Sequence, residues 1–239
     1  MTGAQIFTKL LNLDLNYHDF DWLENQGLSE FELLISVVLT QNTNWKNVLK
    51  ALENLKKENI ASLEQINTLS NLELATLIKP SGFYNTKTKR LKGLVESIIN
   101  TYENLENFKT NASREWLLNI KGLGFESVDS ILNYLCKREI LVVDNYSLRL
   151  AFYLGYEFEN YEELREFFQS DIESEQENLY KILGKKCELY ELYQIFHALI
   201  VAFAKQSFKG QKLSPKGEEW IKILKEDLCK QKEVNLYLF

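Results

Sequence analysis

Residues 120–127 read Ile-Lys-Gly-Leu-Gly-Phe-Glu-Ser, and this stretch decides the fold. It places a tight Gly122-x-Gly124 turn between two segments whose apolar residues have helical spacing. Two glycines one residue apart let the backbone turn sharply and approach a ligand closely. The helix after the turn offers free N–H groups and the positive end of its dipole, which suit a phosphate. The stretch therefore predicts a phosphate-binding hairpin, with a plain helix–helix turn as the alternative.

An acidic residue, Asp144, follows 18 positions after Glu126 and precedes Asn-Tyr-Ser. Aspartate at this point is a good helix N-cap, and a cap needs no further role. If the helix from Phe125 runs antiparallel to the one that Asp144 opens, Asp144 and Glu126 face one cleft. An ionised carboxylate there can stabilise a cationic sugar and orient or deprotonate water, by analogy with glycoside hydrolysis. Asp144 is therefore the candidate catalytic residue.

Few chain breakers punctuate the sequence, which favours long helices with short connections. The 239 residues include 2 prolines and 10 glycines, and 45% are hydrophobic, as in a globular protein. The short apolar run at 140–143 has no partner strand in sight and is interpreted as a buried connector. The apolar spacing predicts helices over 30–41, 44–58, 71–78, 87–102, 114–120, 125–135, 144–155, 161–169, 188–205 and 218–229.

We therefore expect an all-α protein with two helical lobes, a helix-hairpin-helix motif and a central cleft. Residues 25–138 would form a central helical lobe that contains the hairpin Lys121–Phe125. Residues 1–24 and 139–239 would form the second lobe from both ends of the chain. A cleft between lobes is a common place for a ligand.

Several classes of protein fit the sequence poorly. Its three cysteines, Cys136, Cys187 and Cys229, are far apart and form no C-x-x-C pair, so no metal site is expected. The first residues lack the features of a signal peptide, and no apolar run is long enough for a membrane span. We expect a cytoplasmic protein with reduced thiols and no membrane partner.

The charge balance alone argues mildly against a nucleic-acid partner, because the net charge is −6. Its distribution matters more, since salt confines each charge to its neighbourhood. Positive charge gathers at 87–92 and again over 205–216, whereas acidic residues gather at 157–178. Ordinary solvated faces are the alternative interpretation of each cluster.

Three ordered blocks carry a resemblance to a known family. Residues 118–150 resemble the helix-hairpin-helix-Gly/Pro-Asp signature of the endonuclease III superfamily of DNA glycosylases. Residues 32–43, Glu-Leu-Leu-Ile-Ser-Val-Val-Leu-Thr-Gln-Asn-Thr, resemble its first core helix and the turn after it. Residues 79–91, beginning Lys-Pro-Ser-Gly-Phe-Tyr-Asn, resemble the next loop and helix. The small bacterial 3-methyladenine DNA glycosylases are the most similar subgroup.

Two departures from the family pattern sharpen what the resemblance implies. Members that also cleave the strand carry a lysine where this chain has Glu126, and a carboxylate cannot form their Schiff base. The resemblance therefore implies a monofunctional enzyme without AP lyase activity. Many members bind an iron–sulfur cluster through four cysteines after the last long helix, but residues 203–209 contain none. No cofactor is expected.

The resemblance also suggests a role for individual residues. Asp144 matches the catalytic aspartate, and Gln41, followed by Asn42, matches the residue that fills the gap left by the flipped base. The implied contacts to the DNA backbone are Lys121, Gly122, Leu123, Gly124, Phe125 and Ser127. The implied base pocket contains Trp22, Trp45, Glu126 and Lys205. Aromatic walls would attract a cationic alkylated purine by about 0.5–2 kcal/mol.

Each pocket residue has a plainer alternative. The two tryptophans can be core residues, Glu126 can face solvent, and Lys205 can sit at a helix end. His197 lies in an apolar helix and is interpreted as a satisfied core histidine rather than a catalytic one.

The function implied is a glycosylase of base excision repair that hydrolyses an alkylated purine, flipped out of damaged double-stranded DNA, and leaves an abasic site. We expect a monomer in the bacterial cytoplasm, associated with the nucleoid through DNA. The alternatives are a bifunctional glycosylase/AP lyase for oxidised pyrimidines, a mismatch adenine glycosylase, and a non-catalytic helix-hairpin-helix DNA-binding protein. The sequence does not rank the alkylated bases.

Overall fold

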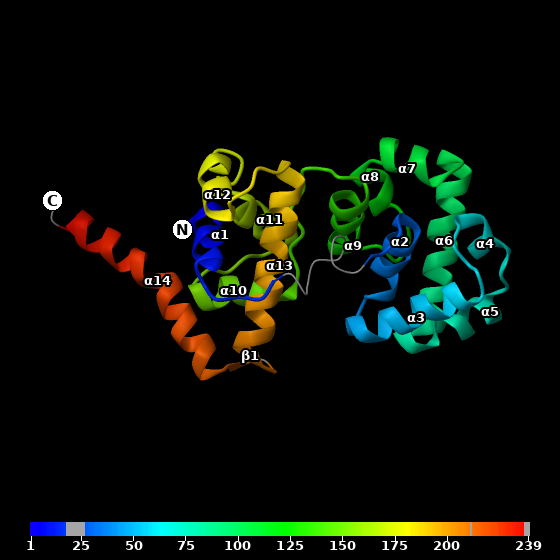
Figure 1. Cartoon of the computed structure of the whole chain (residues 1–239), viewed down its shortest axis with the longest axis horizontal. Helices are drawn as coiled ribbons and strands as arrows, with labels where there is room; N and C mark the ends of the chain where they lie inside the picture. The colour runs from blue at the N-terminus through cyan, green and yellow to red at the C-terminus, as the bar shows by residue number, and fades with distance from the viewer. Residues whose placement is uncertain (18–26, 211, 237–239) are drawn as a thin grey trace. The chain divides into compact units, whose positions relative to one another are not determined.

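The computed structural model describes residues 1–17, 27–210 and 212–236, with side chains up to residue 226. Helices make up nearly all of its regular structure (Figure 1). Within the described ranges the one sheet is a two-stranded antiparallel hairpin, in which β1 (Phe208–Lys209) pairs with β2 (Lys212–Leu213). The predicted all-α class is confirmed. No helix of these ranges is long and apolar enough to cross a membrane.

The chain divides into two compact units. Residues Trp22–Arg138 form one, called here the central unit. Residues Met1–Asp21 and Glu139–Phe239 form the other, called the terminal unit because both ends of the chain belong to it.

The central unit consists of helices joined by short turns, many of which begin at a side-chain cap. In chain order they are α2 (Glu30–Leu39), α3 (Trp45–Lys57), α4 (Leu63–Thr68), α5 (Asn71–Leu77), the short 3₁₀ helix η2 (Lys79–Ser81), α6 (Tyr84–Tyr102), α7 (Leu105–Asn111), α8 (Arg114–Leu118), α9 (Phe125–Ser130) and the π-helical turn η3 (Ile131–Leu135).

Helix α2 is the centre of this unit. A capping box starts it: the Glu32 N–H donates to Ser29 Oγ at 3.2 Å, and the Ser29 N–H donates to Glu32 Oε2 at 2.8 Å. Every residue from Leu33 to Leu39 is buried, so the helix is apolar nearly all round. Helices α3, α6 and η3 pack around it.

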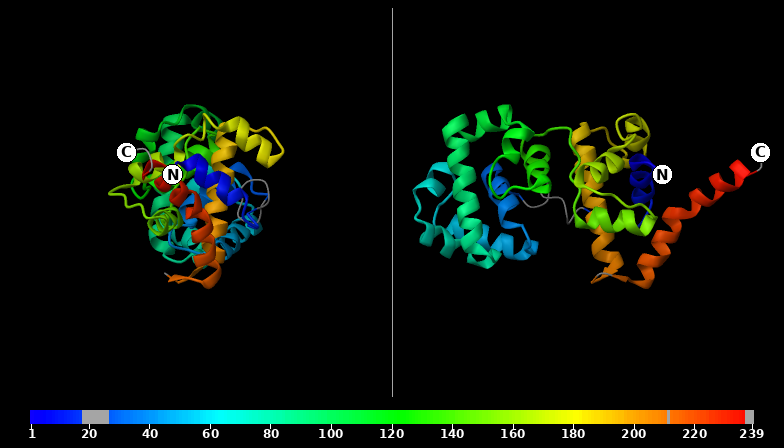
Figure 2. Two further views of the ribbon diagram at one scale, coloured as in Figure 1. Left: turned by 90° about the vertical axis from the view of Figure 1, so that its left-hand side faces the viewer. Right: turned by 180° about the vertical axis from the view of Figure 1, so that it is seen from behind.

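The terminal unit is built around one long apolar helix, α13 (Leu189–Ser207). Helices α1 (Gly3–Leu11), α10 (Asn145–Leu154) and α14 (Pro215–Leu236) pack against it, and Figure 2 shows α13 beside α1 and α10 from two directions. The remaining helices of the unit are α11 (Tyr161–Gln169) and α12 (Gln176–Leu183).

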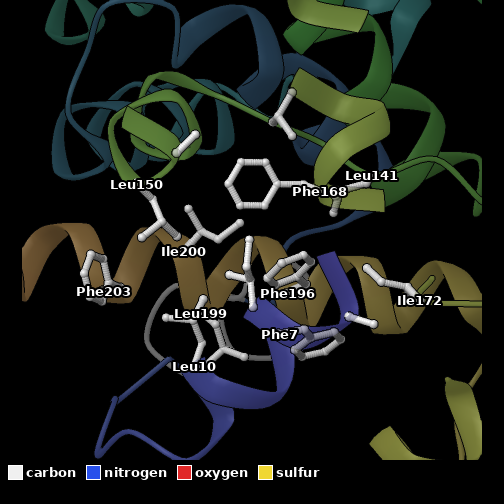
Figure 3. Close-up of a cluster of buried hydrophobic side chains, with 14 of the residues drawn as sticks. Phe7, Leu10, Leu141, Leu150, Phe168, Ile172, Phe196, Leu199, Ile200 and Phe203 are labelled. Carbon is white, nitrogen blue, oxygen red and sulfur yellow. The ribbon is translucent and has the colours of Figure 1, made fainter. Parts of the chain in front are cut away.

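Aromatic rings fill the core of the terminal unit (Figure 3). The rings of Phe7 on α1 and Phe196 on α13 stack with their centroids 4.7 Å apart, and Phe168 lies 5.8 Å from Phe196. The run 140–143 is buried without strand pairing, which confirms the predicted connector. This connector leads directly into Asp144 and so places the start of α10 against the core.

The predicted helices match the structure in kind, with shifts at their ends. Helix α6 begins at Tyr84, three residues earlier than predicted, because the chain enters it through Phe83 in a left-handed conformation. Helices α4, α7 and α12 were not predicted. They span 6, 7 and 8 residues.

Candidate functional site

The predicted hairpin is present in the central unit between α8 and α9. The Leu123 N–H donates to the Ile120 carbonyl at 3.1 Å and closes the turn. Gly122 has φ +97°, and a Cβ added there would lie 2.6 Å from Arg90 Cγ. Glycine is therefore required at 122 by both conformation and space.

At the second glycine, Gly124, neither backbone conformation nor space requires a glycine. Gly124 has an ordinary φ of −99° as the N-cap of α9, and a Cβ added there would meet no described atom within 4 Å. The residue is exposed. A glycine that the fold itself does not require, at the start of a helix, leaves the backbone N–H groups open to a bound group.

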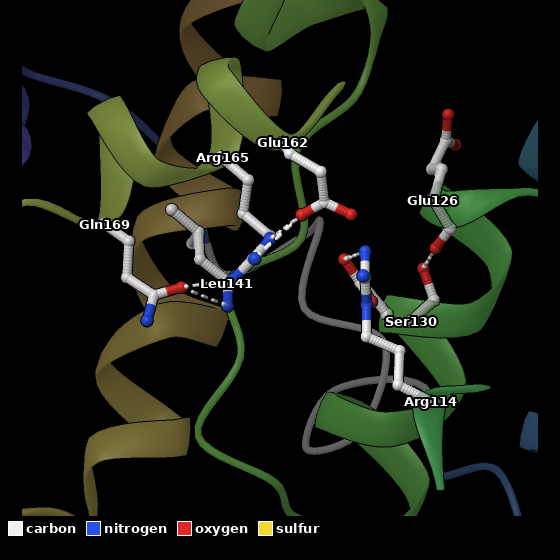
Figure 4. Close-up of polar contacts among 8 residues, drawn as sticks. Arg114, Glu126, Ser130, Leu141, Glu162, Arg165 and Gln169 are labelled. Carbon is white, nitrogen blue, oxygen red and sulfur yellow. Dashed lines mark hydrogen bonds and ion pairs between the residues drawn. The ribbon is translucent and has the colours of Figure 1, made fainter. Parts of the chain in front are cut away.

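A partly buried ion pair joins the two helices of the hairpin to each other. The Arg114 guanidinium on α8 donates to both carboxylate oxygens of Asp129 on α9, at 2.6 and 3.1 Å. The same guanidinium lies 5.2 Å from the ring centroid of Phe125. Figure 4 shows Arg114 beside Ser130, whose hydroxyl donates to the Glu126 carbonyl at 2.7 Å while the Glu126 carboxylate points away. The start of α9 is thus held rigidly.

Gln41 joins the turn after α2 to this hairpin. Its Nε2 atom donates to the Gly122 carbonyl at 3.1 Å and to Ser127 Oγ at 3.0 Å. Its Oε1 atom accepts a hydrogen bond from Arg90 on α6. Asn42, the next residue, is exposed with φ 52°. The predicted DNA-contacting residues Gln41, Gly122 and Ser127 therefore form one connected group.

The basic residues at 87–92, which form one positive cluster in the sequence, do not form one positive face in the structure. Lys87 is 1% exposed, and its ammonium donates to the carbonyls of Leu39 and Ser81 and to Thr43 Oγ1 at 2.7–2.8 Å. Burial, with a smaller contribution from the charge of Arg90, lowers the pKa of Lys87 to about 8. Its role is to tie the turn after α2 to the start of α6.

Lys92 also faces inward, since it donates to the backbone carbonyls of Asn67 and Leu69. The other two basic residues of the cluster are Lys89 and Arg90. Together with Lys121 of the hairpin, they line a groove of about 680 Å³. Thr86, Ser97 and Asn119 add hydroxyl and amide groups, and none of the described residues that line the groove is acidic. Such a lining suits a phosphate backbone.

An exposed aromatic residue, Phe83, was missed by the sequence prediction. It is 70% exposed and has φ 45°, a conformation that is costly for a residue with a side chain. Gly82 before it also has a positive φ, of 65°. A strained, exposed ring beside the α6 N-terminus is suited to stack on a base or enter a base step. The Gly-Phe pair directly before a helix was the sequence signal that could have indicated this residue.

Asp144 belongs to the terminal unit, and one of its oxygens caps α10. Its Oδ1 atom accepts from the Tyr146 N–H at 2.9 Å, the Ser147 N–H at 2.9 Å and the Ser147 hydroxyl at 3.1 Å. The predicted N-cap is confirmed. The side chain is 14% exposed, so the carboxylate is nearly buried but still reaches solvent.

The other carboxylate oxygen faces His197. The Nε2 atom of His197 on α13 lies 3.8 Å from Asp144 Oδ2, which is an ion-pair distance when the imidazole is protonated. Burial raises the pKa of Asp144, but His197 and the Ser147 donors lower it, and the net shift is downward. The prediction of a buried histidine is confirmed, with a charged neighbour that was not foreseen.

Lys205 lies two turns after His197 on α13. Eight residues leave the two side chains roughly 80° apart around the helix, within the width of one face, and this spacing was the signal that could have linked them. Lys205 keeps contact with solvent, yet burial lowers its pKa while the charge of Asp144 raises it, with a net downward shift. Two basic groups of α13 therefore act on the one carboxylate.

The other predicted pocket residues fall in the central unit. Trp45 is half-buried at the first position of α3, and Glu126 is exposed in the first turn of α9. Trp22 lies outside the described residues. The proposed meeting of Asp144 with Glu126 and Trp45 stays a prediction.

Within the part of the chain that the structure describes, no three His, Cys, Asp or Glu side chains come together in a way that could hold a metal ion. Cys136 is buried, and burial raises the pKa of its thiol to about 11, which keeps it protonated. The expected absence of an iron–sulfur cluster stays a prediction.

A hairpin suited to a phosphate backbone, together with a capped, ionised aspartate, defines the class of a helix-hairpin-helix DNA-repair protein. Residues 35–174 match the model of the HhH-GPD superfamily base excision DNA repair proteins. The match covers more than half of the chain, so the protein belongs to this superfamily.

Its relatives agree with this assignment. A Methanocaldococcus jannaschii protein named as a DNA repair glycosylase is 37% identical over 210 residues, which cover 84% of this chain and 88% of that protein. The crystal structure of H. pylori 3-methyladenine DNA glycosylase (MagIII) bound to 1,N6-ethenoadenine matches with a TM-score of 0.78 and 38% identity, over 87% of this chain and 100% of that one.

A trapped endonuclease III–DNA covalent intermediate shares the fold at 20% identity. Its TM-score is 0.62, and the match covers 90% of this chain and 91% of that one. The protein is accordingly a DNA glycosylase of base excision repair.

Proposed function

We propose that this protein is a monofunctional DNA glycosylase that removes an alkylated, 3-methyladenine-like purine from double-stranded DNA and leaves an abasic site. One observation carries the proposal: Asp144 is an ionised carboxylate with one oxygen bound into a helix cap and the other directed to basic groups. Such a group can act on a sugar cation and on water without forming an imine.

In the proposed reaction, the bond between the base nitrogen and the sugar C1′ breaks, and its electron pair leaves with the base. An alkylated purine that carries a positive charge leaves as a neutral molecule, so it is a good leaving group. The Asp144 carboxylate stabilises the oxocarbenium-like sugar, water adds to C1′, and the released water proton goes to Asp144 Oδ2.

The absence of lyase activity is proposed from Glu126. A strand-cleaving glycosylase needs an amine to form a Schiff base with the sugar, and the first turn of α9 carries this carboxylate instead. Lys205, on the same unit, carries an amine that interacts electrostatically with Asp144. Because the pKa of Lys205 is lowered by burial, the trapping experiment below tests that residue as well.

The proposed preference for an alkylated purine rests on the similarity of this chain to a solved structure. The similar H. pylori structure is titled a 3-methyladenine DNA glycosylase bound to 1,N6-ethenoadenine. In this chain, Trp22 and Trp45 are the aromatic residues proposed as pocket walls, with Glu126 and Lys205 beside the base. An aromatic face and a carboxylate both favour a cationic base over a neutral one.

The proposed partner is duplex DNA that contains damaged bases, bound by a monomer without a cofactor. The N–H groups after Gly124 would hold one phosphate, and the groove lined by Lys89, Arg90 and Lys121 would hold the adjoining backbone. The exposed ring of Phe83 would stack in the duplex where the base has left.

The test is release of methylated bases from alkylated duplex DNA, followed by chromatography of the products. The parent should release 3-methyladenine, and Asp144→Asn should lose at least about a hundredfold in single-turnover rate because the anion is gone. Asp171→Asn is the matched control, since it makes the same change at an exposed site of the same unit. A parent that binds DNA but releases no base would instead be a non-catalytic DNA-binding protein.

A second assay distinguishes a monofunctional glycosylase from one that is also an AP lyase. Borohydride is added while the protein acts on DNA with an abasic site, and a covalent adduct would show that an amine had formed a Schiff base. We expect no adduct. An adduct that Lys205→Gln abolishes would overturn the monofunctional assignment.

A further inference from the structure

The two oxygens of the Asp144 carboxylate have different surroundings. All three hydrogen bonds of the α10 cap end on Oδ1, from the Tyr146 N–H and from the N–H and hydroxyl of Ser147. The Ser147 hydroxyl also accepts from the Asp144 N–H at 3.2 Å, which completes the capping box. The cap therefore fixes the position of the carboxylate, while Oδ2 is directed toward α13.

The group that faces Oδ2 is a buried imidazole. His197 is 7% exposed and follows Phe196, which stacks on Phe7 in the core of the unit (Figure 3). A polar ring in such a core loses hydration, and this cost needs a compensating interaction. His197 Nε2 lies 3.8 Å from Oδ2, beyond the range of about 2.7–3.2 Å for a hydrogen bond but within reach of charge attraction.

We infer that His197 is a positioning residue for the catalytic carboxylate, which keeps Asp144 Oδ2 ionised and turned toward α13 while the helix cap holds Oδ1. The inference rests on the proposed function of Asp144. A nearly buried carboxylate tends to take up a proton, and a neutral Asp144 could neither stabilise a sugar cation nor accept a proton from water. Once protonated, His197 provides the opposing charge.

The sign of the effect follows from the attraction between opposite charges. A positive charge on the imidazole, 3.8 Å from Asp144 Oδ2, favours the ionised carboxylate, and the interaction with His197 lowers the pKa of Asp144. Without this cation, Asp144 would be protonated at a higher pH, and the acidic limb of the rate profile would move upward.

The other charged groups of the surrounding helices differ from His197 in their contacts. Lys205 interacts with Asp144 from the same helix, and replacing His197 leaves this lysine in place. Arg149 on α10 and Lys9 on α1 donate to backbone carbonyls at 3.0 and 2.9 Å. Lys216 on α14 lies over an aromatic ring. His197 differs from these groups because its Nε2 atom lies 3.8 Å from Asp144 Oδ2, an ion-pair distance.

The first test measures single-turnover base release from pH 5 to pH 9 for the parent, His197→Gln and His197→Asn. Both variants keep a polar side chain and remove the positive charge. The acidic limb of the rate profile should move to higher pH in both variants, so the ratio of the rate at pH 8 to the rate at pH 5 should rise. Tyr193→Phe, which removes a buried polar group one turn earlier on α13, should leave the ratio unchanged.

The second test needs no substrate. The Asp144 carboxyl carbon is followed by ¹³C NMR as the pH is lowered, in the parent and in whichever of the two His197 variants retains the parent's circular dichroism. We expect the Asp144 pKa to be higher in the variant. An unchanged pKa overturns the inference, whatever the activity. A raised pKa in a protein that releases no methylated base would support the inference and reject the proposed function.

Discussion

Arg90 and Gln41 are joined by a hydrogen bond of 2.5 Å from the guanidinium NH1 to the side-chain oxygen Oε1. The same amide of Gln41 donates from its nitrogen to the Gly122 carbonyl and to Ser127 Oγ. One side chain thus connects α6, the turn after α2 and the hairpin. A planar amide that is bonded at both its nitrogen and its oxygen can move very little, so it sets the position of the hairpin on the central unit.

Gln41→Leu should loosen the hairpin. The change keeps the size of the side chain but leaves the Gly122 carbonyl, Ser127 and Arg90 without this partner. We expect a loss of about 1–3 kcal/mol in the free energy of unfolding and faster hydrogen exchange at the Leu123 N–H, which closes the turn. Gln65→Leu is the control, because Gln65 lies in a surface capping contact of the same unit. Equal exchange rates in both variants would refute this role.

The two glycines of the turn should respond differently to alanine. Gly122→Ala introduces a Cβ at positive φ, 2.6 Å from Arg90 Cγ, and should cost about 1–3 kcal/mol in the free energy of unfolding. Gly124→Ala meets no described atom and should change that free energy by about 0.5 kcal/mol or less. If a phosphate approaches the backbone here, Gly124→Ala should still weaken binding to undamaged duplex DNA severalfold. Unchanged binding would show that the phosphate lies elsewhere.

Local signals in the sequence predicted the parts of the fold that depend on local contacts. The N-cap at Asp144 depends only on residues within one turn of the start of α10. The apolar run at 140–143 was assigned correctly as a connector because no partner strand was available. The hairpin was found because Gly122 must adopt a conformation that few other residues tolerate.

Contacts between distant residues could not be predicted in this way. Lys87 looks like a surface cation in sequence, and only the fold brings three oxygen acceptors around its ammonium. His197 looks like a core residue, and it is one, but Asp144 lies 53 positions earlier in the chain. Arg90 contacts both Gln41 and Gly122 only because α6 lies beside the hairpin in the fold, and the sequence does not show this.

The groove beside the hairpin should contribute to the salt dependence of DNA binding. If Lys89 and Lys121 each neutralise one phosphate, Lys89→Gln and Lys121→Gln should each reduce the slope of log K against log salt concentration by about 0.9. The slope is measured by fluorescence anisotropy on undamaged duplex DNA between about 50 and 200 mM salt. Lys57→Gln is the control, since Lys57 is exposed on α3 and pairs with Glu53. An equal slope in all three variants would exclude the groove as a phosphate site.

Lys87 should make the stability of the protein depend on pH in the alkaline range. Its pKa is about 8 in the folded protein and about 10.4 in an unfolded chain. Between these values the unfolded state binds more protons, so the free energy of unfolding should increase as the pH rises from about 8 to about 10.4. Lys87→Met removes this increase but leaves the carbonyls of Leu39 and Ser81 without a donor, and it should be less stable than the parent by about 2 kcal/mol or more at pH 7. Urea titrations of both proteins at several pH values measure the difference. A parent curve that runs parallel to the variant curve would mean that burial does not lower the pKa of Lys87 and that its three hydrogen bonds hold it fully charged.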